Sequence, residues 1–383
     1  MNWRFHRGLL ATYVPLLALF IGAGKPVTAD IPFRVASYNV LFFDSGDSGR
    51  TGYLQTVISE MEPDILMLQE MRTSGGPLMT GLLQGIAPDY APTVINDGSA
   101  AYFRTGVVSF ISFTAIQTDL RDITEYVFDV GGNEIRVYDC HLKASQGSEN
   151  ENRRLLELQS LHAHLSSLPT GTEYLVAGDM NLYTSSEPGY QYMTNDMNLV
   201  DLLSVAGPWH NNAAYAHVHT QSTRTTRFGG GATGGLDDRF DFILSSYEFN
   251  NNAGCEFLAG SYTSFGNDGN HFNVSIVMGA NGVVSAAVAN ALHEASDHLP
   301  VYADFVSRTE PWTLATAIMF ESNTVSLSWA TLPMQSNYTV YSASSLLTNF
   351  TVNLSGTFVG TNTWFSPIPS DEVRRFYYVG PRN

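Results

Sequence analysis

The sequence predicts an α/β domain followed by a small module made only of strands. Two observations support this prediction. Over residues 33–306, short apolar runs typical of buried strands alternate with longer segments whose apolar residues recur about every three or four positions, as on one face of a helix. Over residues 307–383, charged residues become rare, and short segments rich in Thr, Ser, Val and Tyr alternate with turn residues, which favours a β-sandwich.

The expected elements follow in chain order. Strands are expected over 33–40, 64–70, 100–104, 107–117, 124–130, 134–143, 174–177, 239–245, 255–261 and 299–305. Helices are expected over 52–61, 76–85, 149–167, 189–195 and 284–294. The first has Leu54, Val57, Ile58 and Met61 at helical spacing and stops before Pro63, and the third has Leu155, Leu158, Leu161 and Leu165 on one face. Gly131 and Gly132, between two strands, indicate a tight hairpin. In the C-terminal module, strands are expected over 324–329, 338–342, 357–359 and 375–379.

The first residues have the pattern of a secretory signal peptide. Arg4 and Arg7 precede an apolar run over 8–23, and small residues end at Ala29, where we expect cleavage. The run is shorter than the roughly 20 residues that a membrane-spanning helix needs, and it contains Pro15, which argues against a retained anchor. We therefore expect a secreted or periplasmic protein with no stable membrane insertion.

The chain is strongly acidic. It carries 19 Lys and Arg against 36 Asp and Glu side chains, a formal net charge of −17. Cleavage would remove Arg4, Arg7 and Lys25, leaving 16 basic against 36 acidic side chains, a net charge of −20, with Lys143 as the last lysine. Such a surface repels a polyanion at long range. A phosphate-bearing substrate must therefore be held by local contacts and by a bound cation.

Two cysteines are present, Cys140 and Cys255. A disulfide between them is compatible with export, whereas the apolar strand around Cys140 favours a buried free thiol. The sequence leaves both arrangements open.

Asp179 and Asn181 follow the apolar run 174–177 and lie two residues apart. On an extended backbone, residues two apart point to the same side. A carboxylate can accept a proton from water, and a carboxamide can donate to developing negative charge, so the pair suits phosphoryl chemistry. The structural alternative is that Asp and Asn simply favour the turn after a strand.

Polar residues also mark the ends of other expected strands. Glu70, Asp297 and Asn39 would supply the oxygen ligands that a hard divalent cation prefers. Taken singly, each of these residues is more often a solvated or hydrogen-bonded side chain. Together they form a set with complementary chemical roles.

Two histidines complete this set. His298 is a candidate general base, and Asp241 is a candidate partner that would fix its tautomer, since an imidazole works best when a carboxylate orients it. Asp241 lies in an apolar strand, where a buried carboxylate needs a partner. His141, at another strand end, would donate to a phosphate oxygen.

The chain resembles the endonuclease/exonuclease/phosphatase superfamily over residues 31 to about 306. The resemblance implies a four-layer α/β sandwich, in which two mixed β-sheets pack face to face with helices outside and the site at one end of the sheets. The matching motifs, in the family's order, are Ser37-Tyr38-Asn39, Leu68-Gln69-Glu70, His141-Leu142-Lys143, Gly178-Asp179-Met180-Asn181, Arg239-Phe240-Asp241 and Ser296-Asp297-His298-Leu299-Pro300.

Together, the sequence patterns and the resemblance predict three parts: a signal peptide over 1–29, a catalytic domain over 30–306 and a β-sandwich-like module over 307–383. The resemblance implies that Glu70 binds Mg²⁺, with Mn²⁺ or Ca²⁺ as alternatives. Asn39 would hold a metal-bound water or a phosphate oxygen, and Asp297 would serve the metal site.

The same resemblance assigns the catalytic residues. Asp179 would position or activate the attacking water, and Asn181 would steady the phosphoryl oxygens. His141 would contact the scissile phosphate, and His298, oriented by Asp241, would be the general base or a phosphate contact.

Substrate contacts are expected from basic side chains near these motifs. The candidates are Lys143, Arg104, Arg224, Arg227 and Arg239. The glycine-rich segment 217–235 is long enough to be a functional loop. One departure concerns the deoxyribonucleases of the family, in which a further acid pairs with the histidine that corresponds to His141. The sequence around 100–104 has no obvious acid, and Asp97 is only a weak candidate.

The leading hypothesis is a secreted, divalent-metal-dependent phosphodiesterase, a monomeric nuclease that hydrolyses DNA or RNA by in-line attack of an activated water. The alternative within the same chemistry is a phosphoesterase acting on phospholipid head groups, as sphingomyelinases do, or on small phosphomonoesters. It ranks lower because the sequence shows no apolar hairpin expected to enter a bilayer. A hypothesis of another class is a non-catalytic binding or adhesion protein.

Overall fold

The computed structural model describes residues 30–251 and 253–308 and, in the C-terminal module, residues 316–321, 324–329, 338–343, 351–352, 356–358, 363–367 and 376–381. The expected signal peptide lies outside the described residues. No helix among the described residues is long and apolar enough to cross a membrane.

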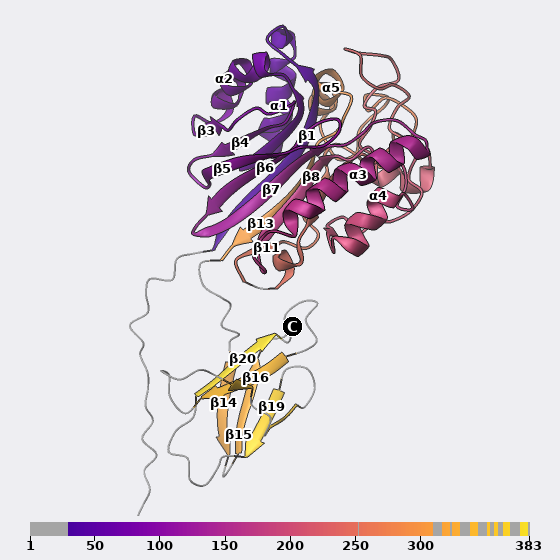
Figure 1. The fold of residues 1–383 in the computed structure, drawn as a ribbon. Helices are drawn as coiled ribbons and strands as arrows, with labels where there is room; N and C mark the ends of the chain where they lie inside the picture. Colours follow the sequence, from indigo (N-terminus) through magenta and orange to yellow (C-terminus); the bar gives the residue numbers. More distant parts are fainter. Residues whose placement is uncertain are drawn as a thin grey trace, which may run out of the picture.

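Two mixed sheets form the centre of the α/β domain (Figure 1). The first has the order β11-β13-β1-β2-β4-β3, with β12 beside β13, and its strands are β1 (Ile31–Phe43), β2 (Ile65–Met71), β3 (Tyr90–Pro92), β4 (Ala100–Arg104), β11 (Cys255–Phe257), β12 (Thr263–Ser264) and β13 (Val301–Ser307). The second has the order β5-β6-β7-β8-β10-β9, and its strands are β5 (Ser109–Ile116), β6 (Ile123–Val130), β7 (Asn133–His141), β8 (Glu173–Asp179), β9 (Val200–Asp201) and β10 (Asp241–Ser245).

The two sheets pack face to face. One buried cluster contains Val35 and Met67 of the first sheet together with Val137 and Leu175 of the second. Within each sheet, parallel pairs (β1 with β2, β7 with β8) stand beside antiparallel pairs (β1 with β13, β8 with β10). The predicted pair of mixed, facing sheets is confirmed.

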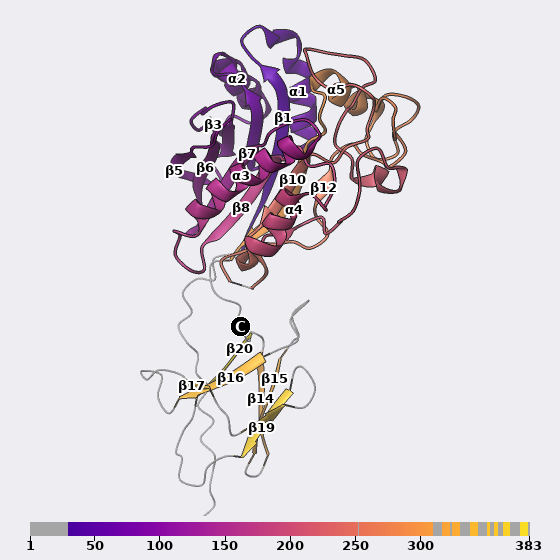
Figure 2. The same cartoon turned by 45° about the vertical axis from the view of Figure 1, so that its right-hand side comes forward.

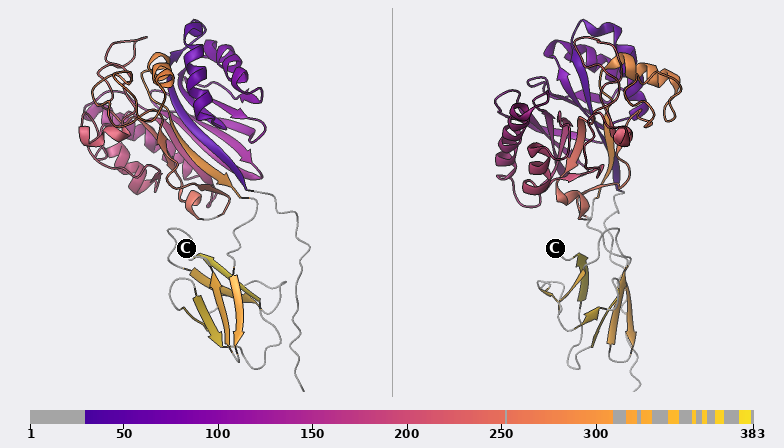
Figure 3. Two further views of the ribbon diagram at one scale, coloured as in Figure 1. Left: turned by 180° about the vertical axis from the view of Figure 1, so that it is seen from behind. Right: turned by 90° about the vertical axis from the view of Figure 1, so that its right-hand side faces the viewer.

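Helices cover the outer face of each sheet (Figures 2 and 3). The helices α1 (Thr51–Met61), α2 (Gly76–Ile86) and α5 (Ala286–Ala295) pack on the first sheet. The helices α3 (Ser148–Leu165) and α4 (Pro188–Gln191) pack on the second, and α4 continues into one π-helical turn over Tyr192–Asp196. The result is the four-layer sandwich that the resemblance implied.

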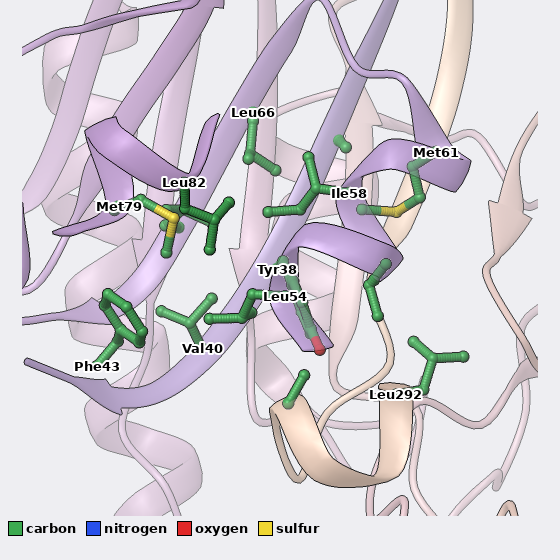
Figure 4. Close-up of a cluster of buried hydrophobic side chains, with 14 of the residues drawn as sticks. Tyr38, Val40, Phe43, Leu54, Ile58, Met61, Leu66, Met79, Leu82 and Leu292 are labelled. Carbon is green, nitrogen blue, oxygen red and sulfur yellow. The ribbon is translucent and has the colours of Figure 1, made fainter. Parts of the chain in front are cut away.

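The first helical layer shows how the sequence pattern becomes packing (Figure 4). Leu54 and Ile58 of α1 lie on the buried face that their spacing predicted, against Tyr38 and Leu66 of the sheet. The helix ends where Glu62 adopts a left-handed φ of 49°, directly before a proline. Removing such side chains from water is the main favourable contribution to folding.

The second helical layer departs from its prediction in one detail. Leu158, Leu161 and Leu165 of α3 are buried as expected, whereas Leu155 is only half-buried. Arg154 is buried instead because its guanidinium pairs with Glu187, which precedes α4. A charge at this position is tolerated only because it has this partner.

The structure also settles the predicted hairpin and the state of the two cysteines. Gly131 and Gly132 form the two-residue hairpin loop with φ of 66° and 96°, the positive values that tight hairpins require. Cys140 in β7 and Cys255 in β11 are both buried and free, so the disulfide alternative is not adopted.

The described part of the C-terminal module consists of strands in two small antiparallel sheets, as its composition predicted. One has the order β14-β15-β19-β18 and the other β17-β16-β20, formed by β14 (Thr316–Glu321), β15 (Thr324–Trp329), β16 (Tyr338–Ala343), β17 (Thr351–Val352), β18 (Thr357–Phe358), β19 (Thr363–Pro367) and β20 (Phe376–Pro381).

Candidate active site

Strand ends from both sheets meet at one edge of the sandwich. In the first sheet, Asn39 of β1 lies one register position from Glu70 of β2. In the second, His141 of β7 lies opposite Asp179 of β8, and Asp179 lies opposite Asp241 of β10. The pairing of strands distant in sequence therefore delivers these side chains to one place.

Gly178 makes this register possible. A Cβ built on Gly178, whose φ is 132°, would lie 1.9 Å from the carbonyl oxygen of Cys140 in the neighbouring strand. Only glycine lets β7 and β8 approach so closely immediately before His141 and Asp179.

Asp179 is the hub of the cluster. Its Oδ2 accepts a hydrogen bond from Nδ2 of Asn39 at 3.1 Å, and it lies 3.5 Å from Nε2 of His141 and 3.7 Å from Nε2 of His298. Its Oδ1 accepts from the backbone N–H of Asn181 at 3.1 Å. The residue is only 2% exposed, so these neighbours determine its charge.

His298 and Asp241 form a buried pair. Nδ1 of His298 lies 2.9 Å from Oδ2 of Asp241, and both side chains are almost completely buried. The Asp241 N–H donates to the hydroxyl of Thr220 at 3.2 Å. The side-chain amide of Gln221 lies 2.6 Å from Nε2 of His298, and the amide oxygen is the group that can accept a hydrogen bond from a protonated imidazole there.

Glu70 lies at the open side of the cluster, in a left-handed conformation with φ of 58°. Its Oε1 accepts from Nδ2 of Asn39 at 3.1 Å, and its Oε2 accepts from the backbone N–H of Phe42 at 3.1 Å. Nε2 of His141 lies 3.7 Å from Oε1. A strained non-glycine residue held by such contacts is typical of functional sites.

Asp297 joins the cluster through the glycine-rich loop. Its Oδ2 accepts from the backbone N–H of Ala232 at 2.6 Å, whereas its Oδ1 is buried without a hydrogen-bond partner among the described residues. A Cβ at Gly231 would lie 2.7 Å from Oδ2, so a glycine is needed where the loop passes this carboxylate.

The donor set suits a hard divalent cation. Glu70 and Asp297 offer carboxylate oxygens, and the buried Oδ1 of Asp297 has no hydrogen-bond partner in the part of the chain that the structure describes. The amide oxygen of Asn39 accepts from the backbone N–H of Leu41 at 3.0 Å. Within the described ranges, no group of three or more His, Cys, Asp or Glu side chains is arranged so that it could hold a metal ion. Mg²⁺ does not require one, because it keeps several waters and is typically held by one or two carboxylates.

Burial and neighbouring charges separate the titratable groups. Burial raises the pKa of Asp179 to about 7; the charge of His298 opposes this shift, and those of Asp241 and Glu70 add to it. Burial, with Arg121 and His298, holds the pKa of His141 well below its usual value. Burial alone would also lower the pKa of His298, but the carboxylates of Asp241 and Asp179 outweigh it and raise that pKa well above its usual value.

These shifts distinguish the two imidazoles. His141 is neutral near pH 7, and His298 is cationic. Burial also raises the pKa of Glu70 in the absence of a cation, although Asn39 opposes the shift. Asp179, a carboxylate with a pKa near 7, and the buried imidazolium of His298 beside it are the kinds of group that acid–base chemistry needs.

Arg239 does not lie at the site, so its expected contact with substrate is wrong. Its side chain is fully buried, and its two terminal nitrogens donate to the two oxygens of Asp201 at 2.9 and 2.7 Å. The guanidinium also packs over the ring of Phe242 at 4.1 Å. Asp201 contacts Arg239 in the fold but lies far from it in the sequence, so this ion pair could not be predicted from the sequence.

Arg104, which was also expected to contact the substrate, lies at the opposite end of the sheet from Glu70. Because β4 runs antiparallel to β2, Arg104 lies beside Asp64 at the start of β2, whereas Glu70 lies near its other end. Its side chain pairs with Asp89 at 2.8 Å. The expected contact between Arg104 and substrate is therefore corrected.

The other expected cations have different environments. Arg224 is buried, and its guanidinium is engaged at the end of α5, where it donates to the carbonyl of His293 and lies 3.9 Å from Glu294. Its expected substrate contact is corrected as well. Nζ of Lys143 donates to the carbonyl of Ala144 at 2.6 Å, and its role as a substrate contact stays a prediction.

Sequence reasoning missed two residues of the site. Gln221 contacts His298 and lies in the glycine-rich loop that was expected to be functional, but nothing local distinguishes it there. Arg121 donates to the carbonyls of His141 and Leu142 at 2.8 and 2.7 Å. Asp97, the weak candidate for an acid paired with His141, accepts instead from the backbone N–H of Asp122 at 2.9 Å.

Sequence comparison now identifies the family. A model of the Endonuclease/Exonuclease/phosphatase family matches residues 36–298, from the strand that carries Asn39 to His298. The chain belongs to this family. Family membership supports phosphoester hydrolysis as the class of reaction. No curated protein sequence matches the chain.

Several solved structures are similar to this chain. They include D. rerio TDP2 complexed with a single-strand DNA product (15% identity, covering 72% of this chain and 98% of that one, TM-score 0.49). Others are the human Nocturnin catalytic domain with bound sulfate (17%, 72% and 96%, 0.47) and a mannosyl-6-phosphatase of Bacteroides thetaiotaomicron (16%, 71% and 99%, 0.46).

Proposed function

We propose that this member of the Endonuclease/Exonuclease/phosphatase family is a secreted, divalent-metal-dependent phosphodiesterase that hydrolyses nucleic acid. The observation that carries the proposal is the convergence of His141 and His298 on the carboxylate of Asp179, at 3.5 and 3.7 Å, at one edge of the two sheets. Export is proposed from the leader-like first residues. Nucleic acid is proposed because His141-Leu142-Lys143 resembles the nuclease version of its motif.

Glu70 would hold the cation, with Asp297 and Asn39 serving the same site, since Glu70 is a partly exposed carboxylate and the buried Oδ1 of Asp297 has no hydrogen-bond partner among the described residues. A bound Mg²⁺ would polarise the phosphoryl group and stabilise negative charge on the leaving oxygen. The other residues then orient substrate and water and move protons.

Asp179 accepts the proton of the attacking water. Its pKa of about 7 in the cation-free protein places it close to the working pH, where a general base is most effective. The backbone N–H of Asn181 orients the carboxylate. The Asn181 amide donates to the carbonyl of Leu142 at 3.3 Å, and its second N–H can donate to a phosphoryl oxygen.

The histidines stabilise charge on the phosphate. Of the two roles expected for His298, general base and phosphate contact, we propose the second: Asp241 and Asp179 keep it cationic, so it offers a charged donor to a phosphoryl oxygen. His141 is neutral and donates one N–H without adding charge. Because the cluster is nearly buried, these donors act more strongly than they would in water.

The test is hydrolysis of a panel of phosphoesters by the purified protein, with and without a chelator. We expect cleavage of DNA or RNA that is lost with the chelator and restored by Mg²⁺. Asp179→Asn should lower kcat by about 10²–10⁴-fold, the usual contribution of a positioned general base. Asp119→Asn, a matched change in an exposed loop, should leave kcat unchanged.

An Asp179→Asn protein that loses folding and activity together would assign this residue a structural role. A protein that is inactive on every phosphoester with and without metal would favour the non-catalytic alternative.

One observation favours the phospholipid alternative as a second candidate. The sequence was expected to lack an exposed apolar hairpin, but Val277, Met278 and Val283, in the segment before α5, are 40%, 66% and 61% exposed. Exposed apolar side chains can enter a lipid surface. Faster hydrolysis of sphingomyelin vesicles than of any oligonucleotide would decide for this candidate.

A further inference from the structure

A cavity of about 400 Å³ opens directly beside Glu70 and His141. Its walls include Phe42, Arg72 and Arg121, none of which was singled out in the sequence. This volume lies in the range of about 300–1,000 Å³ that is usual for small-ligand sites. The cavity is continuous with the proposed catalytic cluster, because Glu70 and His141 line both.

The two arginines in this cavity are unusual for the chain. Most arginines in the described ranges pair with a carboxylate, as expected for a protein with a net charge of −17. Among the described arginines, Arg72, Arg121, Arg153 and Arg227 form no ion pair, and two of these four line the same cavity.

Arg121 is already oriented, since its guanidinium donates to the carbonyls of His141 and Leu142. Guanidinium groups are well suited to binding phosphate. The cavity therefore places two guanidinium groups beside the carboxylates of Glu70 and Asp97, and it adjoins the place where the scissile phosphate is proposed to bind.

Phe42 presents an aromatic ring at the mouth of the cavity. It is 43% exposed, although it follows the buried part of β1. Phe42 and Leu41 have left-handed φ values of 47° and 48°, which bulky residues rarely adopt. The Phe42 N–H donates to Glu70, and the Arg72 guanidinium packs over the ring at 5.3 Å.

Strained backbone of this kind persists where the surrounding structure imposes it, and it clusters at ligand sites. Here it exposes an apolar ring beside two unpaired cations. A planar, apolar surface next to positive charge matches the two parts of a nucleotide, its base and its phosphate.

We propose that this cavity binds the nucleotide adjacent to the scissile phosphate, with its base stacked on Phe42 and its other phosphate held by Arg121 and Arg72. The inference rests on the proposed nuclease function and adds a subsite to it. Stacking would be tolerant of sequence, because every base has an aromatic face. Asp97 also lines the cavity, and its carboxylate accepts from the backbone N–H of Asp122.

The test combines removal of the ring with removal of the base. The substrates are a short single-stranded oligodeoxynucleotide and two copies of it, each with an abasic residue on one side of the cleaved linkage. For the wild type, loss of the stacked base should lower kcat/KM by about 5–150-fold, the usual value of base–aromatic stacking. On the intact oligonucleotide, Phe42→Ala should lower kcat/KM by a similar factor. On the abasic oligonucleotide, the kcat/KM of Phe42→Ala should be close to that of the wild type, because no base is left to stack.

Two further variants complete the design. Phe42→Leu keeps an apolar side chain without the ring and should resemble Phe42→Ala. Arg121→Gln should reduce the slope of log kcat/KM against log salt concentration by about 0.7, the value for one phosphate contact on a single strand. Arg153→Gln, which removes an unpaired cation outside this cavity, should change neither quantity.

The outcomes separate the two proposals. Equal losses on intact and abasic substrates for Phe42→Ala would overturn the subsite while leaving the nuclease function in place. A wild-type protein that cleaves no oligonucleotide would overturn both. A loss that depends on the base, seen with only one of the abasic substrates, supports the subsite and assigns its side of the cleaved linkage.

Discussion

Replacing Arg239 tests whether this arginine is structural, as the fold indicates, or binds substrate, as its motif suggested. The proposed change is Arg239→Met, which keeps length and apolar bulk but removes the charge. It leaves Asp201 only 7% exposed and without its guanidinium partner. Tyr190 and the N–H of Leu203 still donate to Asp201, but neither carries charge.

The magnitude follows from burial. Breaking a buried ion pair by removing one partner costs about 3–5 kcal/mol, because a charge remains buried without compensation. For a domain of about 150–250 residues, each 1 kcal/mol corresponds to about 2–4 °C in Tm. We therefore expect Arg239→Met to lower Tm by roughly 6–20 °C.

The assay is thermal unfolding followed by circular dichroism, together with kcat/KM at a temperature where the variant remains folded. We expect kcat/KM to stay within about twofold, because the guanidinium lies outside the site. The double variant Arg239→Met/Asp201→Asn should recover part of the lost stability, since it removes the orphaned charge. An unchanged Tm with a raised KM would refute this reasoning and restore Arg239 as a substrate contact.

Two more predictions concern the strands that deliver the site. Gly178→Ala should abolish activity and lower Tm, because its Cβ would lie 1.9 Å from the Cys140 carbonyl oxygen; a fully active, equally stable variant would contradict the close approach of β7 and β8. Burial raises the pKa of Glu173 from 4.5 to about 7, so the folded state favours its protonated form, and stability is lost as pH rises between these values. Glu173→Gln should reduce the difference in unfolding free energy between pH 5 and pH 8 by about 2 kcal/mol in chemical denaturation, and an unchanged difference would exclude this carboxyl as its source.

Much of the fold followed from local patterns. The runs around Asn39 and His141 were recognisable as strands because they are short, apolar and rich in strand-forming residues. The face of α1 followed from the spacing of Leu54, Ile58 and Met61. Polar residues that end such runs were visible as candidates for chemistry, and their order along the chain suggested the family that the sequence comparison then confirmed.

The basic residues were predicted less well. No local sequence pattern distinguishes Arg239 and Arg104, which lie away from the site, from Arg72 and Arg121, which line the cavity beside it. Arg239, which precedes β10, is held away from the site by its ion pair with Asp201 of the neighbouring strand β9. Arg104 is removed by the antiparallel register of its strand, which sends its end away from Glu70.

The sequence by itself determined the longer strands and helices of the α/β domain and the kinds of side chain at the strand ends, because these depend on neighbours a few residues away. The short strands β3, β9 and β12 were not expected, since two or three residues carry no recognisable pattern. The tertiary structure alone decided which of the charged groups meet and which histidine keeps its proton. His141 and His298 have the same intrinsic chemistry. Their pKa values move in opposite directions because Asp241 pairs with only one of them, and that pairing exists only after distant strands have come together.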